Sequence, residues 1–186
     1  MDPAFPVWLE DMEQAARDQT FKDDREKMML AVRTSAESIR HQGGPFGAAI
    51  FDRATHQLVA LGANCVVPCN CSHWHAEMVA IYRAEAASGR FNLRACGEQG
   101  YELFSSCEPC VMCIGGTLWA GVTRLIFGAL DEDARTIGFD EGPKHPEWQA
   151  YLRARQVEVV GGLCREEARA VLQRYSDDSG LIYNAT

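Results

Sequence analysis

Residues 101–129 read YELFSSCEPCVMCIGGTLWAGVTRLIFGA, with a cysteine pair between two apolar runs. The runs over residues 101–106 and 125–129 have the length and composition of β-strands. The segment from about residue 109 to residue 120 predicts a helix, and Gly121 is a helix stop. A strand, a helix and a strand in succession favour a parallel pair of strands, which indicates an α/β fold.

Strand and helix signals continue to alternate on both sides of this segment. Residues 46–51 and 58–67 predict two strands, and the turn-forming stretch 52–56 between them favours an antiparallel hairpin. Residues 156–160 predict a fifth strand. Further helices are predicted over residues 7–19, 23–41, 73–88 and 165–175, with a short helical piece in the loop 131–146.

These elements suggest one folding unit. Asp23 or Asp24 is expected to cap the second helix, and Ser72 to cap the third. A chain of 186 residues in which five strands alternate with helices predicts a single domain, residues 1–186, with helices on both faces of the sheet. The last residues, 176–186, show no periodic pattern.

The composition is that of an ordinary globular protein, with 47% hydrophobic and 24% charged residues. A chain of this length buries roughly 70% of the surface that its unfolded form exposes, so it needs no disulfide bonds to fold. The net charge is −8, and the sequence has no basic stripe of the kind that follows a phosphate backbone. A nucleic-acid partner is therefore disfavoured, and a small neutral substrate is favoured.

Eight cysteines are present, but their setting argues against a disulfide framework. Residues 1–6 contain neither the basic region nor the apolar region of a signal peptide. No apolar run reaches the roughly 18 residues that a membrane helix needs. We therefore expect a cytoplasmic location, where thiols stay reduced and a Cys-x-x-Cys pair is more often a metal or redox site.

His75, Cys110 and Cys113 carry one imidazole and two thiols, which suit a tetrahedral zinc ion. The two cysteines are expected to share a face in the first turn of a helix behind Pro109, where the helix dipole favours thiolate. Three protein ligands leave the fourth zinc position open for water, as in catalytic rather than structural sites. Glu77 is expected to reach that water and the substrate instead of the metal.

Other interpretations of the cysteines stay open. Cys110 and Cys113 could be buried inert thiols or a redox dithiol, although no thioredoxin-like sequence surrounds them. Cys69 and Cys71 also resemble a metal pair, but one intervening residue is shorter than common zinc spacing, so we interpret them as structural. A non-catalytic zinc domain that binds a partner or senses redox would need a fourth protein ligand.

The sequence resembles a known enzyme family at several places. Residues 75–77, His-Ala-Glu, followed by residues 109–113, Pro-Cys-Val-Met-Cys, resemble the signature of the cytidine deaminase superfamily of zinc-dependent nucleotide and nucleobase deaminases. Residues 43–48, GGPFGA, look like the substrate loop of its purine-acting members, and Asn64 matches their base-contacting asparagine. Residues 137–140, IGFD, are similar to a stretch near the active site of bacterial guanine deaminases.

This resemblance, over roughly residues 24–165, implies a three-layer α/β/α sandwich with a five-stranded mixed sheet. It also implies one zinc ion per subunit and a homodimer. In the guanine deaminase branch the C-terminal segment can swap between subunits and cap the partner's site. We therefore expect residues 176–186 to cap an active site, with Tyr183 as the capping residue.

The acid that contacts the substrate is less clearly marked. Guanine deaminases commonly carry an aspartate soon after the strand that ends here near Ala129. Asp131, Glu132 and Asp133 crowd that place, and Glu141, just after the Ile-Gly-Phe-Asp run, is another candidate.

The reaction implied by the family is hydrolytic deamination of guanine to xanthine and ammonia. Glu77 would take a proton from the attacking water, pass it to a ring nitrogen and then protonate the departing amino group. The predicted catalytic residues are Glu77 and Glu141, and the predicted substrate-binding residues are Phe46, Asn64, Ala76, Asp131 and Tyr183. The plainer alternatives are a solvated loop acid for Glu141, core packing for Phe46 and a turn residue for Asn64.

Other substrates stay open at this stage. A tRNA adenosine deaminase carries the same zinc signature, but the charge of −8 and the lack of a basic C-terminal helix count against it. Guanosine, cytosine and aminated triazines each present an amino group on an electron-poor ring carbon, so the same chemistry would serve them.

Overall fold

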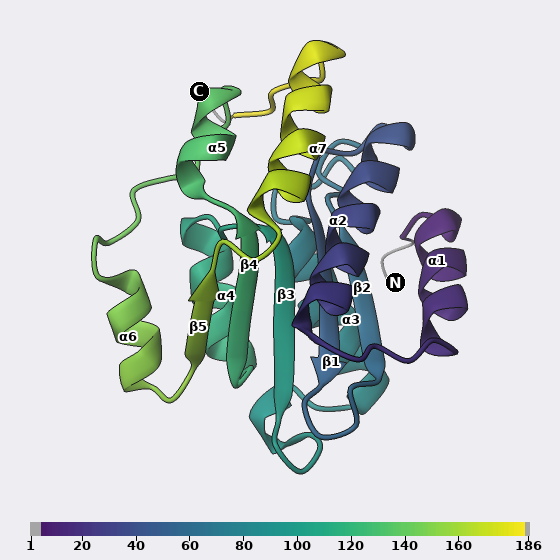
Figure 1. Cartoon of the computed structure of the whole chain (residues 1–186), viewed down its shortest axis with the longest axis vertical. Coiled ribbons are helices and arrows are strands. Elements are labelled where there is room, and N and C mark those ends of the chain that lie inside the picture. The colour runs from purple at the N-terminus through teal and green to yellow at the C-terminus, as the bar shows by residue number, and fades with distance from the viewer. Residues whose placement is uncertain (1–4, 185–186) are drawn as a thin grey trace.

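The fold is built on one mixed sheet with the strand order β2-β1-β3-β4-β5. A computed structural model describes residues 5–184 (Figure 1). β1 runs antiparallel to both β2 and β3, whereas β3, β4 and β5 are parallel, as their separation by helices predicts. The strands are β1 (Gly47–Asp52), β2 (Leu58–Ala63), β3 (Tyr101–Cys107), β4 (Arg124–Ala129) and β5 (Glu158–Gly161).

Helices cover both faces of this sheet. Figure 1 shows α2 and α7 in front of it and α3 and α4 behind it, with α1 beside β2 and α6 beside β5. The helices are α1 (Val7–Arg17), α2 (Asp24–Arg40), α3 (Ala76–Ser88), α4 (Val111–Ala120), α5 (Asp131–Thr136), α6 (Trp148–Ala154) and α7 (Arg165–Asp177), with a 3-10 turn at Leu93–Ala95. The predicted three-layer α/β/α architecture with a five-stranded mixed sheet is confirmed.

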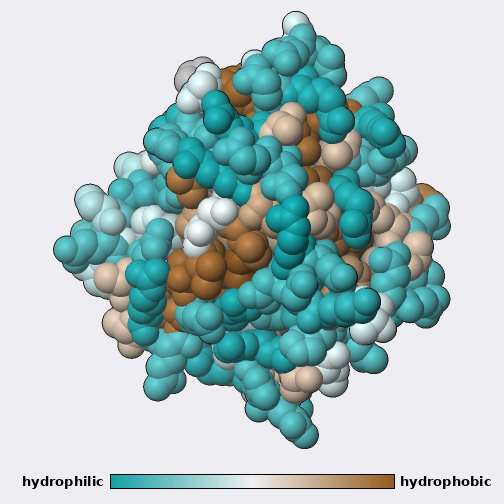
Figure 2. Space-filling model, in the orientation of Figure 1, coloured by the Kyte–Doolittle hydropathy of each residue, from teal (hydrophilic) through white to brown (hydrophobic). Residues whose placement is uncertain are grey.

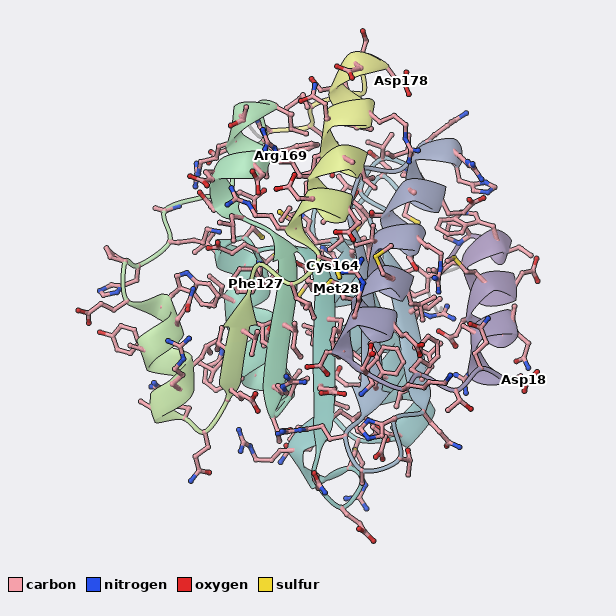
Figure 3. All side chains as sticks on the ribbon, in the orientation of Figure 1. Asp18, Met28, Phe127, Cys164, Arg169 and Asp178 are labelled. Atoms are coloured by element: carbon pink, nitrogen blue, oxygen red, sulfur yellow. The ribbon has the colours of Figure 1, made fainter. Side chains whose placement is uncertain are left out.

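The core is divided by the sheet into two layers. Ile50 and Leu103 pack into the layer beneath α3 and α4, while their neighbours Phe51 and Phe104 pack into the layer beneath α2. This alternation follows the two-residue period of a strand, and every one of these side chains is fully buried. Figure 3 labels Met28 and Cys164 where α2 and the start of α7 meet over the sheet, and both belong to that second layer.

The surface over this layer is mostly hydrophilic. Figure 2 shows an apolar area between α6 and α7, in the region where Figure 1 shows β4 and β5. Val160 on β5 is only partly buried. Within residues 5–184, no helix is both long and apolar enough to span a bilayer.

Helix starts were predicted with mixed success. Asp23 does cap α2, because its side chain accepts a hydrogen bond of 2.9 Å from the Glu26 amide. The prediction that Ser72 caps α3 is wrong, since the cap position is His75. Residues 65–74 form a series of turns whose two ends are joined by a hydrogen bond of 2.8 Å from the Cys65 amide to the Trp74 carbonyl. Because these turns include Ser72, the helix begins only after them.

Two boundaries near the pocket also differ from the predictions, and one helix was missed. α4 begins at Val111, so Pro109 precedes the helix instead of opening it and Cys110 takes the cap position. β2 ends at Ala63 because Asn64 turns the chain, its side chain accepting a hydrogen bond of 3.3 Å from the Val66 amide. No element was predicted over residues 147–155, where the structure has α6.

Candidate active site

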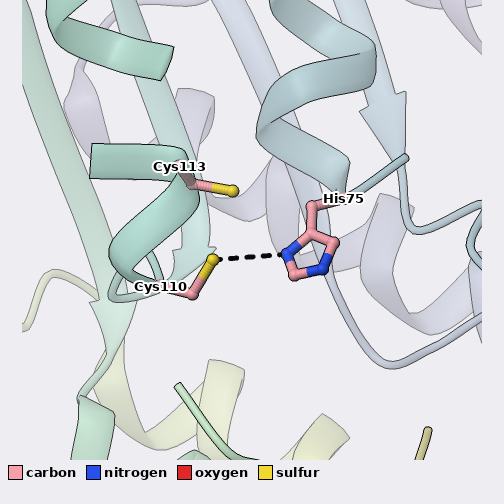
Figure 4. Close-up of side chains that lie close together, drawn as sticks. All are labelled: His75, Cys110 and Cys113. Atoms are coloured by element: carbon pink, nitrogen blue, oxygen red, sulfur yellow. Dashed lines mark hydrogen bonds between the residues drawn. The ribbon is translucent and has the colours of Figure 1, made fainter. Parts of the chain in front are cut away.

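His75, Cys110 and Cys113 meet at the carboxyl end of β3, where α3 and α4 begin (Figure 4). Their ligand atoms all lie within 4.8 Å of one another, and Cys110 Sγ is 3.4 Å from His75 Nδ1. Two segments that are 35 residues apart in the chain therefore form one group, which we call the His–Cys–Cys cluster.

The chemistry of the His–Cys–Cys cluster fits a metal ion. A hydrogen bond from Cys113, assisted by one from His75, lowers the pKa of Cys110 to about 4. A thiolate is therefore present at neutral pH, and thiolate is the form that binds zinc. Within residues 5–184 no further His, Cys, Asp or Glu joins this group of ligand atoms. Three donors with one open position match a catalytic better than a structural zinc site.

Glu77 lies beside the cluster in the first turn of α3, and its side chain is buried. Burial, together with the nearby Cys110 charge, raises the pKa of its carboxyl above the usual range. Glu77 Oε1 accepts a hydrogen bond of 3.1 Å from Ser105 Oγ on β3. A buried carboxyl with a raised pKa and one oxygen anchored can hold or release a proton next to the cluster.

A pocket of about 270 Å³ opens over the His–Cys–Cys cluster. Its lining includes most of the residues that the sequence singled out, namely Phe46, Asn64, His75, Glu77, Cys110, Glu141 and Tyr183. Ser72, Cys107, Glu108, Phe139 and Asn184 also line it and were not predicted. Phe139 and Asp140 do belong to the Ile-Gly-Phe-Asp run that carried part of the family resemblance.

Two predicted substrate-binding residues do not line this pocket. Ala76 is fully buried, and its backbone carbonyl faces Gly62 of β2, where α3 packs closely on the sheet. Asp131, in the first turn of α5, pairs with Arg135 at 2.6 Å and Lys144 at 2.6 Å. The structure thus directs the Asp131 carboxylate to two basic side chains and not to the pocket.

Asn64 and Phe46 lie side by side at one wall of the pocket, where the Asn64 amide donates to the Phe46 carbonyl at 3.1 Å. Asn64 is a turn residue, as its bond to the Val66 amide shows, but its buried side chain also faces the pocket. The Phe46 ring packs edge-on against Phe139 at 5.0 Å and also lines the cavity. Asn64 and Phe46 therefore each have a structural role and also line the pocket.

Glu141 is buried, with 7% of its surface exposed, and it lines the pocket. Burial and the negative charge of Cys110 raise its pKa to about 8. The alternative of a solvated loop acid is therefore wrong. Glu77 and Glu141 place two proton-holding carboxyls around one cavity.

The C-terminal segment after α7 lies across the pocket of its own chain. Tyr175 Oη donates to the Leu181 carbonyl at 2.7 Å, and the Tyr183 ring packs on Phe139 at 5.1 Å. Asn184 makes two hydrogen bonds to the loop that carries Glu141, to the Gly138 carbonyl at 2.8 Å and from the Asp140 amide at 2.9 Å. Tyr183 therefore lines the pocket of its own chain, and its role as a capping residue stays a prediction.

Residues 21–129 match the family model for the cytidine and deoxycytidylate deaminase zinc-binding region. The chain belongs to this family. The match spans both motifs that form the His–Cys–Cys cluster, and the resemblance recognised from the sequence is confirmed.

Relatives of this family member include guanine deaminases. It is 38% identical to a guanine deaminase of Bacillus subtilis (strain 168) over 99 residues, which cover 53% of this chain and 59% of that protein. A solved guanine deaminase from Nitrosomonas europaea is 37% identical, with a TM-score of 0.89 over 95% of this chain and 96% of the other. A protein named NE0047, solved with 2,6-diaminopurine, is 39% identical with a TM-score of 0.89, covering 98% and 95%.

Proposed function

We propose that this deaminase hydrolyses guanine to xanthine and ammonia. The observation that carries the proposal is the convergence of the His–Cys–Cys cluster, Glu77 and Glu141 on one cavity. The similarity to two guanine deaminases and to a protein that binds 2,6-diaminopurine supports a purine with an amino group at C2.

The size of the cavity supports a free base over a nucleoside. Its volume of about 270 Å³ lies below the roughly 300–1,000 Å³ of pockets that hold drug-sized ligands. The Tyr183 ring and the Phe139 ring close one side of it.

We infer that His75, Cys110 and Cys113 hold one Zn²⁺ ion per subunit. When bound in such a three-ligand site, zinc lowers the pKa of water towards neutrality and polarises the atoms it touches. Glu77 accepts the proton of the attacking water and transfers it to the ring nitrogen beside C2. It then carries the second proton of that water from the new C2 hydroxyl to the amino nitrogen, so that the C2–N bond breaks, C2 becomes a carbonyl carbon and ammonia leaves.

The remaining pocket residues orient the base. The Asn64 side chain holds a polar edge of the ring, and Phe46 packs on its face. Glu141, with its pKa raised to about 8 by burial, is protonated at neutral pH and shuttles a proton at the substrate, giving one up and taking it back within the reaction. Tyr183 Oη is buried and has no hydrogen-bond partner within residues 5–184, which suits a hydrogen bond to the substrate.

An ammonia-release assay of the zinc-loaded protein tests this function directly. Guanine should be turned over far faster than guanosine, cytosine or an aminated triazine. Release of ammonia from adenosine in a tRNA anticodon, with no turnover of guanine, would instead identify a tRNA adenosine deaminase. Zinc bound without turnover of any of these would favour a non-catalytic zinc domain.

We also propose a homodimer that forms through α4. Every residue of this helix is uncharged, and Val111, Gly115 and Trp119 follow one another at four-residue spacing along one stripe. Trp119 is 83% exposed and Val111 44%, while a methyl group on Gly115 would meet open space. A second copy that packs on this stripe would bury a large aromatic side chain against a small residue.

Light scattering after size exclusion tests the dimer. Trp119→Ser should convert a dimer into a monomer, and an unchanged dimer would exclude α4 as the contact. Exchange of residues 176–186 between subunits remains a prediction. It would be seen as restored activity when a Tyr183→Ala subunit is mixed with a Glu77→Gln subunit.

We infer a cytoplasmic location from the thiols. All eight cysteines are free, including Cys69 and Cys71, which are partly exposed on the turn beside the pocket. Such thiols persist in a reducing compartment.

A further inference from the structure

The loop over residues 138–142 carries Glu141 into the pocket, and it has no regular secondary structure. A loop of this kind needs partners that fix its backbone before it can hold a carboxyl in place. Basic side chains on both flanks of the loop provide them. Arg135 Nη2 donates to the Gly142 carbonyl at 2.9 Å, and Arg135 Nη1 lies 3.4 Å from Asp140 Oδ1.

Lys144 acts on the other flank of the loop. Its side chain is only 9% exposed, and Nζ donates at 3.1 Å both to Glu108 Oε1 and to the Pro109 carbonyl. Its backbone amide donates to the Gly142 carbonyl at 3.1 Å. Lys144 therefore joins the loop to the turn that leads into Cys110 of the His–Cys–Cys cluster.

Asp131 is the residue that connects these two basic side chains. Its Oδ2 accepts from Arg135 Nε at 2.6 Å, and its Oδ1 lies 2.6 Å from Lys144 Nζ. Its amide also donates to Glu108 Oε2 at 3.2 Å. Without this carboxylate, among residues 5–184, Arg135 would keep only Asp140 and the Gly142 carbonyl, Lys144 would keep only Glu108 and the Pro109 carbonyl, and nothing would join the two basic side chains.

The loop is also bound to the start of α4 through the backbone of Glu141. The Val111 amide, one of the free amides at the start of α4, donates to the Glu141 carbonyl at 3.1 Å. The Glu141 backbone is therefore anchored one residue away from Cys110, so a shift of the loop would move the carboxyl relative to the cluster.

We propose that Asp131 is a positioning residue: through Arg135 and Lys144 it holds the Asp140–Gly142 turn against the start of α4, and so fixes the Glu141 carboxyl in the pocket. This rests on the proposed function, in which Glu141 supplies a proton. It replaces the expected role of Asp131 as a substrate ligand, which the pocket lining does not support.

Asp131→Asn is the test, with Asp133→Asn as its matched control. Asp133 lies on the same helix and pairs with Arg165 at 2.9 Å, which ties α5 to α7, and within residues 5–184 its side chain has no hydrogen bond or ion pair to the 138–142 loop. Asp131→Asn should lower kcat for guanine by about 10- to 100-fold, with KM changed by less than about threefold. Asp133→Asn should lower thermal stability and leave kcat near the wild-type value.

A double-mutant cycle with Glu141→Gln separates positioning from a general loss of structure. If Asp131 acts through Glu141, adding Asp131→Asn to Glu141→Gln should cause little further loss of kcat. If the fold losses of kcat in the two single variants multiply in the double variant, the proposal is overturned. Equal losses in the Asp131→Asn and Asp133→Asn proteins would also overturn it.

Hydrogen exchange of the backbone gives a readout that does not depend on activity. Peptides that cover residues 138–144 should exchange faster in Asp131→Asn than in wild type or Asp133→Asn. Unchanged exchange there would refute the positioning role of Asp131, even if the enzyme deaminates guanine. If the wild-type protein does not deaminate guanine but Asp131→Asn still speeds exchange, the positioning role of Asp131 stands and the proposed function is rejected.

Discussion

At the scale of single residues, Glu77 gives the most direct test of the proposed chemistry. Glu77→Gln keeps the size of the side chain but cannot accept the water proton. Turnover of guanine should fall by at least about 1,000-fold, while zinc content should stay at the wild-type value because the proposed ligands are His75, Cys110 and Cys113. Ammonia release and metal analysis on the same preparation measure the two effects together.

Cys110→Ala is the comparison for that experiment. It removes a proposed zinc ligand, so zinc content and activity should both disappear. Loss of zinc in Glu77→Gln would mean that Glu77 acts as a ligand or supports one. Retained turnover in that variant would reject its role as the proton carrier.

Ser105 is a residue whose importance only the structure reveals. Its hydroxyl anchors Glu77 Oε1 at 3.1 Å from a fully paired strand. Ser105→Ala frees the carboxyl to adopt other rotamers, so kcat should fall by about tenfold with zinc content unchanged. Ser35→Ala is the control, because Ser35 Oγ is buried and bonds only to Val32 of its own helix. Equal kinetics of the two variants would remove Ser105 from the site.

The difference between Glu77 and Ser105 shows how much of the candidate site can be predicted from the sequence. His75, Cys110 and Cys113 are predictable because metal chemistry restricts both their identity and their local spacing. Ser105 has no such signature, and a polar residue within an apolar strand is its sole trace in the sequence. The structural role of Asp131 depends on Arg135 and Lys144 folding back towards it, which no local pattern encodes.

At the scale of elements, the close packing of α3 on β2 positions His75 and Glu77. A Cβ on Gly62 would overlap backbone atoms of Ala76 and Ala80, which cannot yield as a flexible side chain would. Gly62→Ala should therefore lower the free energy of unfolding by about 2–3 kcal/mol and weaken zinc binding. Urea unfolding and zinc titration measure these effects.

Gly115 on α4 offers the matched glycine for that comparison. A Cβ there meets nothing within 4 Å, so Gly115→Ala should raise the stability of the monomer by up to about 1 kcal/mol through helix propensity. The stability should be measured at protein concentrations too low for the dimer to form, since Gly115 lies on the proposed contact stripe. Equal destabilisation by both substitutions would contradict the packing of α3 described above.

Most element types were predictable because strand and helix periods differ, but the start of α3 and the presence of α6 depended on tertiary contacts. The start of α3 was misplaced since the turns over residues 65–74 use hydrogen bonds that span the segment. α6 was missed because its burial rests on two residues, Trp148 and Leu152, packed on the far layer of the core. Seven residues are too few for a clear helical period.

At the scale of the whole molecule, the buried carboxyls make stability depend on pH in opposite directions. Asp133 has its pKa lowered by its hydrogen bond with Arg165, so its contribution is present above about pH 4 and is lost in stronger acid. Glu141 behaves in the opposite way. Burial raises its pKa from 4.5 to about 8, so the folded protein retains a proton that the unfolded chain releases.

The consequence for Glu141 can be measured in the metal-free protein. Its unfavourable ionisation reduces the free energy of unfolding as the pH rises from about 4.5 to about 8, and adds nothing further above that range. Glu141→Gln removes this term. The variant should therefore gain stability relative to wild type with rising pH, by up to about 1.4 kcal/mol per pH unit, before the difference levels off.

Urea unfolding at several pH values between about 5 and about 9 follows this difference, and Asp133→Asn serves as the reference. Because Asp133 is ionised in both the folded and the unfolded chain over that range, its difference from wild type should stay constant. A constant difference for Glu141→Gln as well would mean that the carboxyl is hydrated in solution. The loop over residues 138–142 would then lie open, and the pocket would lack its second proton-holding group.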